Sequence, residues 1–162
     1  MDKNHNVSHK EYLHADMQDP RLPLAQSLIN TLEKKGTIIA FNANFEKGVI
    51  KKLAKQFPQH ENELMNINER FWDQLVVFRK HYMDYRFKGS NGLKSILPVI
   101  VSGMDYSHLD VSDGSKAQVT WSNMIALSDS PEKEKLISQL LEYCKLDTLA
   151  MVEIHKKLIK IK

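Results

Sequence analysis

The chain has 162 residues, enough for one domain with a proper core, and its single cysteine excludes an internal disulfide and fits a reducing compartment. Its apolar fraction of 42% and charged fraction of 27% are ordinary for a soluble globular protein, and its net charge of +3 permits nucleic-acid binding without arguing for it. No apolar run approaches the length of a membrane span and the start lacks a signal-peptide core, so we expect a cytoplasmic protein with no membrane partner.

Residues 1–18 are polar and contain three of the seven histidines, His5, His9 and His14. Their spacing matches no common metal site, so we predict a mobile or partner-contacting arm, followed by one domain over residues 19–162. Asp19 and the proline after it are typical of a helix start, and Gly36 is typical of a helix end. The apolar positions of this first helix are Leu24, Ala25, Leu28, Ile29 and Leu32.

Residues 37–58 predict a strand that runs directly into a helix. Thr37–Phe41 is β-branched and apolar, asparagines at 42 and 44 indicate a turn, and apolar residues then recur at helical spacing until Pro58. Glu46 falls in the first turn of this helix, on the side that the apolar residues bury. Such a carboxylate needs a partner, and a metal ion is one candidate; the helix dipole alone also favours an acid here.

Residues 59–68 indicate a short helix or loop with Leu64 and Ile67 inward. Residues 70–73 predict a brief strand, and Asp73 is expected to cap a helix from Gln74 to about Met83. Basic and aromatic residues then interleave, which suits a single-stranded nucleic acid, although a solvated helix end explains the pattern too. These residues are Arg79, Lys80, Arg86, Lys88 and Lys94, with Tyr82, Tyr85 and Phe87.

Three further helices are expected. The glycine-rich turn at 89–92 opens a helix over 93–101, although it lacks a P-loop pattern. The spacing predicts another helix over 116–127 with Trp121 inward, after a turn or cap at Asp113. Ser130 and Pro131 are typical of the cap and first residue of a long final helix.

Asp147 lies in the middle of this final helix among apolar neighbours, and Tyr143 lies one turn earlier on the same face. A buried carboxylate must be paired, protonated or metal-bound; a tyrosine–aspartate hydrogen bond that only completes the core is the alternative to a functional site. Cys144 lies on the apolar side of the helix, which favours a buried structural thiol over a nucleophile.

Two stretches resemble motifs of the DEDD 3′–5′ exonucleases. Asn42-Ala43-Asn44-Phe45-Glu46 resembles their second motif, and Tyr143-Cys144-Lys145-Leu146-Asp147 resembles the tyrosine form of their third. The chain is also similar over nearly its whole length to the C-terminal part of the family called domain of unknown function 2779. The stretches that carry this similarity are 9–13, 19–21, 87–90, 93–98, 113–114 and 143–151.

The resemblance implies an α/β, helix-rich, RNase H-like fold with one to three short strands. It also implies a metal-dependent nuclease that hydrolyses phosphodiesters with two Mg²⁺ or Mn²⁺ ions. Carried over by residue, Glu46 and Asp147 are catalytic metal ligands, Asp73 is a further metal candidate, and Tyr143 orients the attacking water. Asn42, Phe45 and Lys94 are the candidate substrate-binding residues.

Two departures from the motifs matter. The second-motif acid is Glu46 where the exonucleases usually have Asp, and no Asp-x-Glu, the first motif, occurs in these residues. We therefore expect a fragment of a longer protein or a degenerate copy that is inactive alone and lacks the opening strands of the fold. A bare sheet edge would favour a homodimer or pairing with the missing part. The alternatives are a non-catalytic module that binds nucleic acid or protein and a purely structural domain.

Overall fold

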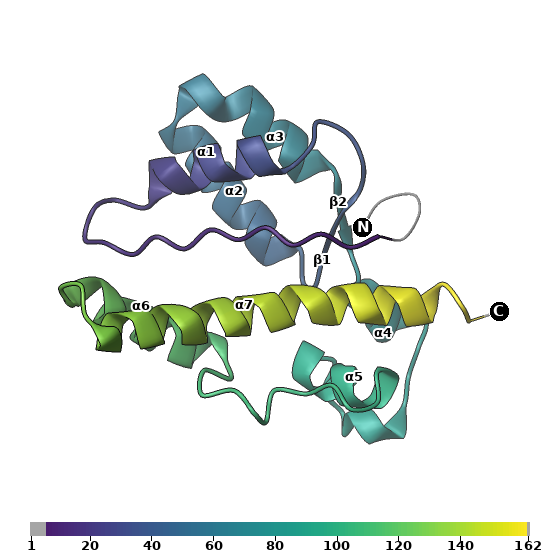
Figure 1. The fold of residues 1–162 in the computed structure, drawn as a ribbon. Helices are drawn as coiled ribbons and strands as arrows, with labels where there is room; N and C mark the ends of the chain where they lie inside the picture. The colour runs from purple at the N-terminus through teal and green to yellow at the C-terminus, as the bar shows by residue number, and fades with distance from the viewer. Residues whose placement is uncertain (1–5, 162) are drawn as a thin grey trace. The chain divides into compact units, whose positions relative to one another are not determined.

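A computed structural model describes residues 6–161, so His5 of the predicted arm lies outside the described residues. The chain divides into two compact units. The central unit is Asp19–Val99, and the terminal unit combines Met1–Gln18 with Ile100–Lys162. Figure 1 follows both units along the chain by colour, and each is described by itself below.

The central unit alternates helices with two very short strands. Its elements are α1 (Arg21–Thr31), β1 (Ile38–Ala40), α2 (Asn44–Gln56), η1 (Pro58–His60), α3 (Glu61–Glu69), β2 (Phe71–Asp73), α4 (Leu75–Lys80), η2 (Tyr85–Phe87) and α5 (Leu93–Ile100). The strands are parallel, and Ala40 pairs with Asp73 at their carboxyl ends. Both predicted strands are therefore confirmed, as is the direct passage from the first into a helix.

The core of the central unit lies between α1, α2 and α3, which Figure 1 shows packed together. Ala25 and Leu64 are completely buried there, and Ile67 is nearly so. The stretch after Pro58, which the sequence left open as helix or loop, is helical because Leu64 and Ile67 reach this core from one face of α3.

The helix α4 is shorter than predicted, since it ends at Lys80 rather than near Met83. The chain turns at His81, where φ is −129°, and this turn lets the Tyr82 ring pack edge-on against Phe78 at 6.0 Å between centroids. Phe87 packs on the same two rings, at 5.9 Å from Phe78 and 6.2 Å from Tyr82. Aromatic burial therefore outweighs continuation of the helix.

The terminal unit is built on α6 (Gly114–Ala126) and the long α7 (Pro131–Leu158), which lie side by side in Figure 1. The predicted cap is confirmed, because the Ser130 hydroxyl oxygen accepts a hydrogen bond from the Lys133 amide at 3.2 Å. Residues 6–18 belong to the same unit, and the indole Nε1 of Trp121 donates to the His14 carbonyl oxygen at 2.9 Å. This bond ties the predicted arm to α6.

The described part of the chain is helix-rich with two short strands, as the sequence predicted. None of the described helices combines the length and the apolar character needed to span a bilayer.

Candidate functional site

Asp73 joins the carboxyl ends of the two strands. Its Oδ1 accepts hydrogen bonds from the Asn42 amide at 2.9 Å and from the Leu75 amide at 3.0 Å. The second bond satisfies the first amide of α4, although the N-cap position of this helix is Gln74 and not Asp73 as predicted. Asn42 has a φ of 72°, in the left-handed region, which asparagine tolerates better than most residues. This turn lets the chain leave β1 and enter α2 within three residues.

Glu46 lies in the first turn of α2 and is half-buried. Its Oε2 is buried and has no hydrogen-bond partner among the described residues. Burial raises the pKa of the Glu46 carboxyl, and the negative charge of Asp73 raises it further. The start of α2 is held in place from α3, because the buried Asn68 donates to the Lys47 carbonyl at 2.8 Å. The central unit thus presents two neighbouring acids at the carboxyl ends of parallel strands.

The candidate substrate-binding residues of the central unit are open to solvent. Phe45 is 70% exposed although it lies in the first turn of an otherwise amphipathic helix, and Asn42 in the preceding turn is exposed too. Lys94 is exposed in the first turn of α5. The Phe45 ring is exposed one residue before a carboxylate with an unpartnered oxygen, and no packing role accounts for this exposure, so the ring is open to contact with a ligand.

Asp147 lies on the inward arc of α7 and is held by tyrosines. The Tyr106 hydroxyl donates to Asp147 Oδ1 at 2.6 Å, and a hydrogen bond to Asp147 also acts on Tyr143. Burial and the Asp147 charge raise the pKa of both phenols well above the usual range, and the two rings lie 6.3 Å apart between centroids. The tyrosine–aspartate hydrogen bond that the sequence offered as an alternative is therefore present.

Tyr106 is the site residue that sequence reasoning missed. It is 6% exposed and lies in the loop between α5 and α6, which has no periodic pattern. No spacing rule connects it to a residue 41 positions away, so only the path of the loop brings it to Asp147.

The prediction of a buried Cys144 was wrong, because its side chain is exposed. The buried residues of α7 are Leu140, Leu146, Ala150 and Ile154. At 100° per residue they define an arc that contains Asp147 and Tyr143 but ends before Cys144.

The predicted site residues fall into two groups, one in each unit. The structure brings Glu46 and Asp73 together in the central unit, and Asp147 and Tyr143 together in the terminal unit. Within residues 6–161 no group of three or more His, Cys, Asp or Glu side chains is arranged to hold a metal ion.

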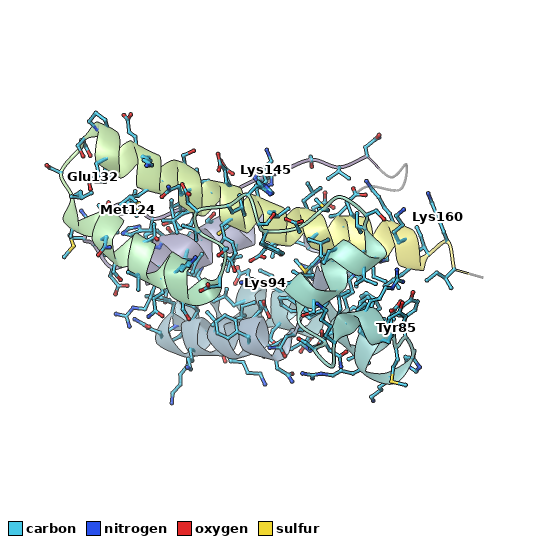
Figure 2. All side chains as sticks on the ribbon, turned by 90° about the horizontal axis from the view of Figure 1, so that it is seen from below. Tyr85, Lys94, Met124, Glu132, Lys145 and Lys160 are labelled. Carbon is cyan, nitrogen blue, oxygen red and sulfur yellow. The ribbon has the colours of Figure 1, made fainter. Side chains whose placement is uncertain are left out.

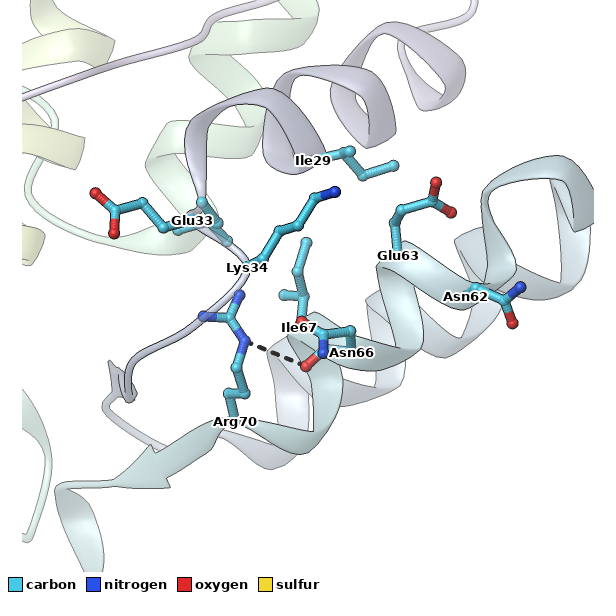
Figure 3. A pocket seen from close by; sticks show the side chains of 9 residues that line it. Ile29, Glu33, Lys34, Asn62, Glu63, Asn66, Ile67 and Arg70 are labelled. Carbon is cyan, nitrogen blue, oxygen red and sulfur yellow. Dashed lines mark hydrogen bonds between the residues drawn. The ribbon is translucent and has the colours of Figure 1, made fainter.

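A separate cavity of about 290 Å³ lies between α1 and α3 (Figure 3). Arg70 closes one side of it, donating from Nε to the Asn66 carbonyl at 3.3 Å and from Nη1 to the Gly36 carbonyl at 3.0 Å. Two acids and two bases line this cavity, so its charges balance: Glu33, Glu63, Lys34 and Arg70. Arg70 immediately precedes β2, whereas Asp73 ends it, so this cavity is at the opposite end of the strand from the acidic pair.

Comparison with known proteins gives one match. No curated protein and no solved structure matches the chain. The family described as Domain of unknown function (DUF2779) matches residues 1–92, which is more than half of the 162 residues. The chain belongs to this family, Domain of unknown function (DUF2779).

Proposed function

We propose that this chain supplies the second-motif and third-motif carboxylates of a metal-dependent, DEDD-type nuclease that hydrolyses phosphodiesters. In this proposal Glu46 and Asp147 are each ligands of divalent ions, with Asp73 beside Glu46. The residues contain no Asp-x-Glu, so a complete two-ion site also needs carboxylates from elsewhere, and we expect the 162 residues alone to be inactive.

The observation that carries the proposal is the unpartnered, buried Oε2 of Glu46. A buried carboxylate oxygen without a donor is costly, and a second acid that raises its pKa adds to the cost. A divalent cation would compensate both charges, and carboxylate oxygens are the ligands that Mg²⁺ and Mn²⁺ prefer. The residues of the central unit therefore fit a contribution of two carboxylates, without forming a complete ligand set.

The bound ions would supply an activated water and stabilise charge at the leaving oxygen. The tyrosines have a different role from the ions. Because their pKa values are raised, Tyr106 and Tyr143 stay protonated at neutral pH and act only as hydrogen-bond donors. Tyr143 is thus suited to orient a water and unsuited to be the general base. Tyr106 is a positioning residue, since its hydroxyl fixes one oxygen of Asp147.

A non-catalytic module is the second candidate. The supporting observation is the 2.6 Å hydrogen bond from Tyr106, which gives Asp147 a partner without any metal ion. Such a module would keep the fold and bind a nucleic acid or a protein.

Calorimetric titration with Mn²⁺ separates the two candidates. We expect the wild-type chain to bind Mn²⁺, and Glu46→Gln and Asp147→Asn each to weaken binding by more than the roughly 10- to 100-fold that loss of an outer partner costs.

The matched control is Glu61→Gln, which removes one exposed carboxylate from the first turn of α3 and should leave Mn²⁺ binding unchanged. Circular dichroism would verify that each variant is folded. Equal binding by wild type and Glu46→Gln refutes the proposed metal site. Loss with Glu46→Gln but not with Asp147→Asn refutes the role of Asp147 as a metal ligand and favours the non-catalytic module.

A further inference from the structure

The positive charge of the chain is concentrated in residues 74–95 of the central unit. This segment has five basic residues and one acid, a net charge of +4, whereas the rest has 18 basic and 19 acidic residues, a net charge of −1. The basic residues are Arg79, Lys80, Arg86, Lys88 and Lys94. The modest overall charge of +3 therefore conceals a strongly basic segment.

The only acid of the segment is already neutralised. Asp84 Oδ2 accepts from Arg86 Nη2 at 2.6 Å and its Oδ1 accepts from Arg86 Nε at 2.9 Å. This pairing lowers the pKa of Asp84 to about 2, so Asp84 is ionised at neutral pH and its charge is balanced by that of Arg86. Arg79, Lys80 and Lys88 are exposed and make no ion pair within the described residues. Their charges are thus available to a partner.

Two large apolar side chains point outward from the same segment. Phe78, Tyr82 and Phe87 pack against one another and anchor the chain between α4 and η2. Met83 and Tyr85 do not join them and are 89% and 92% exposed. Figure 2 labels Tyr85 at the surface of this segment and Lys94 on the following helix. Packing does not explain why an anchored loop presents an exposed phenol ring in a strongly basic segment.

We propose that residues 74–95 form a surface that binds single-stranded nucleic acid. Arg79, Lys80 and Lys88 contact phosphates, and the Tyr85 ring is a platform on which an unpaired base stacks. A single strand is the favoured partner because a duplex keeps its bases stacked on each other and leaves Tyr85 without a face to contact. The inference rests on the proposed function for the reaction, and it adds the surface that holds the substrate strand.

Fluorescence anisotropy with labelled oligonucleotides of about 16 nucleotides tests the surface. The titrations are done in EDTA, which excludes metal-dependent binding and cleavage. We expect Tyr85→Ala to weaken binding at least about fivefold, because a base–aromatic stack contributes about 1 kcal/mol or more. Tyr85→Phe keeps the ring and should bind like the wild type.

The salt dependence tests the cations. Removing three phosphate contacts should lower the slope of log affinity against log salt by about 2, since each contact to a single strand contributes about 0.7. We expect this for the triple variant Arg79→Gln, Lys80→Gln and Lys88→Gln. The matched control removes three exposed lysines from α2 of the same unit, Lys51, Lys52 and Lys55, each changed to Gln.

Equal slopes in the two triple variants, or equal affinities of Tyr85→Ala and Tyr85→Phe, would overturn the inference. So would binding of a duplex as tightly as a single strand. The failures are distinguishable: strand binding in EDTA without any Mn²⁺ binding refutes the nuclease site and leaves this surface standing. Mn²⁺ binding without strand binding does the reverse.

Discussion

Replacing Tyr106 by Phe removes one hydroxyl from the terminal unit and keeps the ring. In the wild type this hydroxyl donates to Asp147 Oδ1 at 2.6 Å from a side chain that is only 6% exposed. The ring contact with Tyr143 remains in the variant, because it needs no hydroxyl. The substitution therefore isolates the hydrogen bond from the packing.

The expected loss of stability depends on whether the acceptor of the hydrogen bond is charged. Hydrogen bonds to charged groups contribute about 1.5–3 kcal/mol, compared with about 0.5–1.5 kcal/mol between neutral groups. Asp147 is half-buried and also has Tyr143 as a donor, so the lower end applies. We expect Tyr106→Phe to lower the free energy of unfolding of the terminal unit by about 1.5 kcal/mol.

Urea unfolding followed by tryptophan fluorescence measures this cost. The two tryptophans lie in different units, Trp72 in the central and Trp121 in the terminal one. In a Trp72→Phe background the signal therefore reports on the terminal unit alone. Asp147→Asn provides a double-mutant cycle, in which the effect of Tyr106→Phe should fall to the neutral range of about 0.5–1.5 kcal/mol.

Tyr12→Phe is the control in the same unit. Its hydroxyl makes an exposed hydrogen bond to His14 Nδ1 at 3.3 Å, so removing it should change stability by less than about 0.5 kcal/mol. If Tyr106→Phe has no larger effect than Tyr12→Phe, the phenol does not stabilise Asp147, and our account of this carboxylate is refuted.

Three further predictions concern the central unit. Burial raises the pKa of Glu46 above its ordinary 4.5, so the native state binds more protons than the unfolded state just above that pH, and the free energy of unfolding declines as the pH rises. Glu46→Gln should remove this decline. Identical profiles of stability against pH for the two proteins from pH 4 to 8 would contradict the burial argument. Leu64→Ala should lower the free energy of unfolding by about 2–5 kcal/mol, measured in urea by the fluorescence of Trp72, because Leu64 is completely buried. A loss below about 1 kcal/mol would show that neighbouring side chains fill the space that Leu64 leaves. Gly36→Ala should destabilise by about 1–2 kcal/mol because φ is +97°; the added Cβ meets nothing within 4 Å, so the cost is that of the backbone conformation alone. Gly48→Ala within α2 should instead stabilise by about 0.5–1 kcal/mol. If thermal denaturation shows stability changes of the same sign for both variants, the conformational argument is refuted.

Most of the local structure could be predicted from the sequence, because its signals are local. Ser130 caps α7 with its own side chain, three residues from the amide that it accepts. The period of the apolar residues predicts Leu64 and Ile67 in the core, where they lie, and Asp73 bonds the first amide of α4 from the end of β2. Each of these features depends on neighbours within one helical turn, so no long-range information was needed.

The candidate site could be predicted only as separate residues. The sequence predicts Glu46 and Asp147 as inward carboxylates, but it contains no signal for the groups that surround them. That Glu46 keeps a buried oxygen without a partner depends on how α2, α3 and the strands pack. That Asp147 meets Tyr106 depends on the course of an irregular loop. The exposure of Cys144 depends on where the buried arc of α7 ends.

The sequence by itself determined the approximate positions of most helices and of both strands, which face of these elements is apolar, and which acids interrupt those faces. Hydrophobic periodicity and helix capping act between residues close along the chain, so they can be read without a structure. The tertiary structure decided which partners those acids have and which rings and cations remain exposed. Burial and hydrogen bonding between distant segments depend on the packing of whole elements, which no local pattern contains.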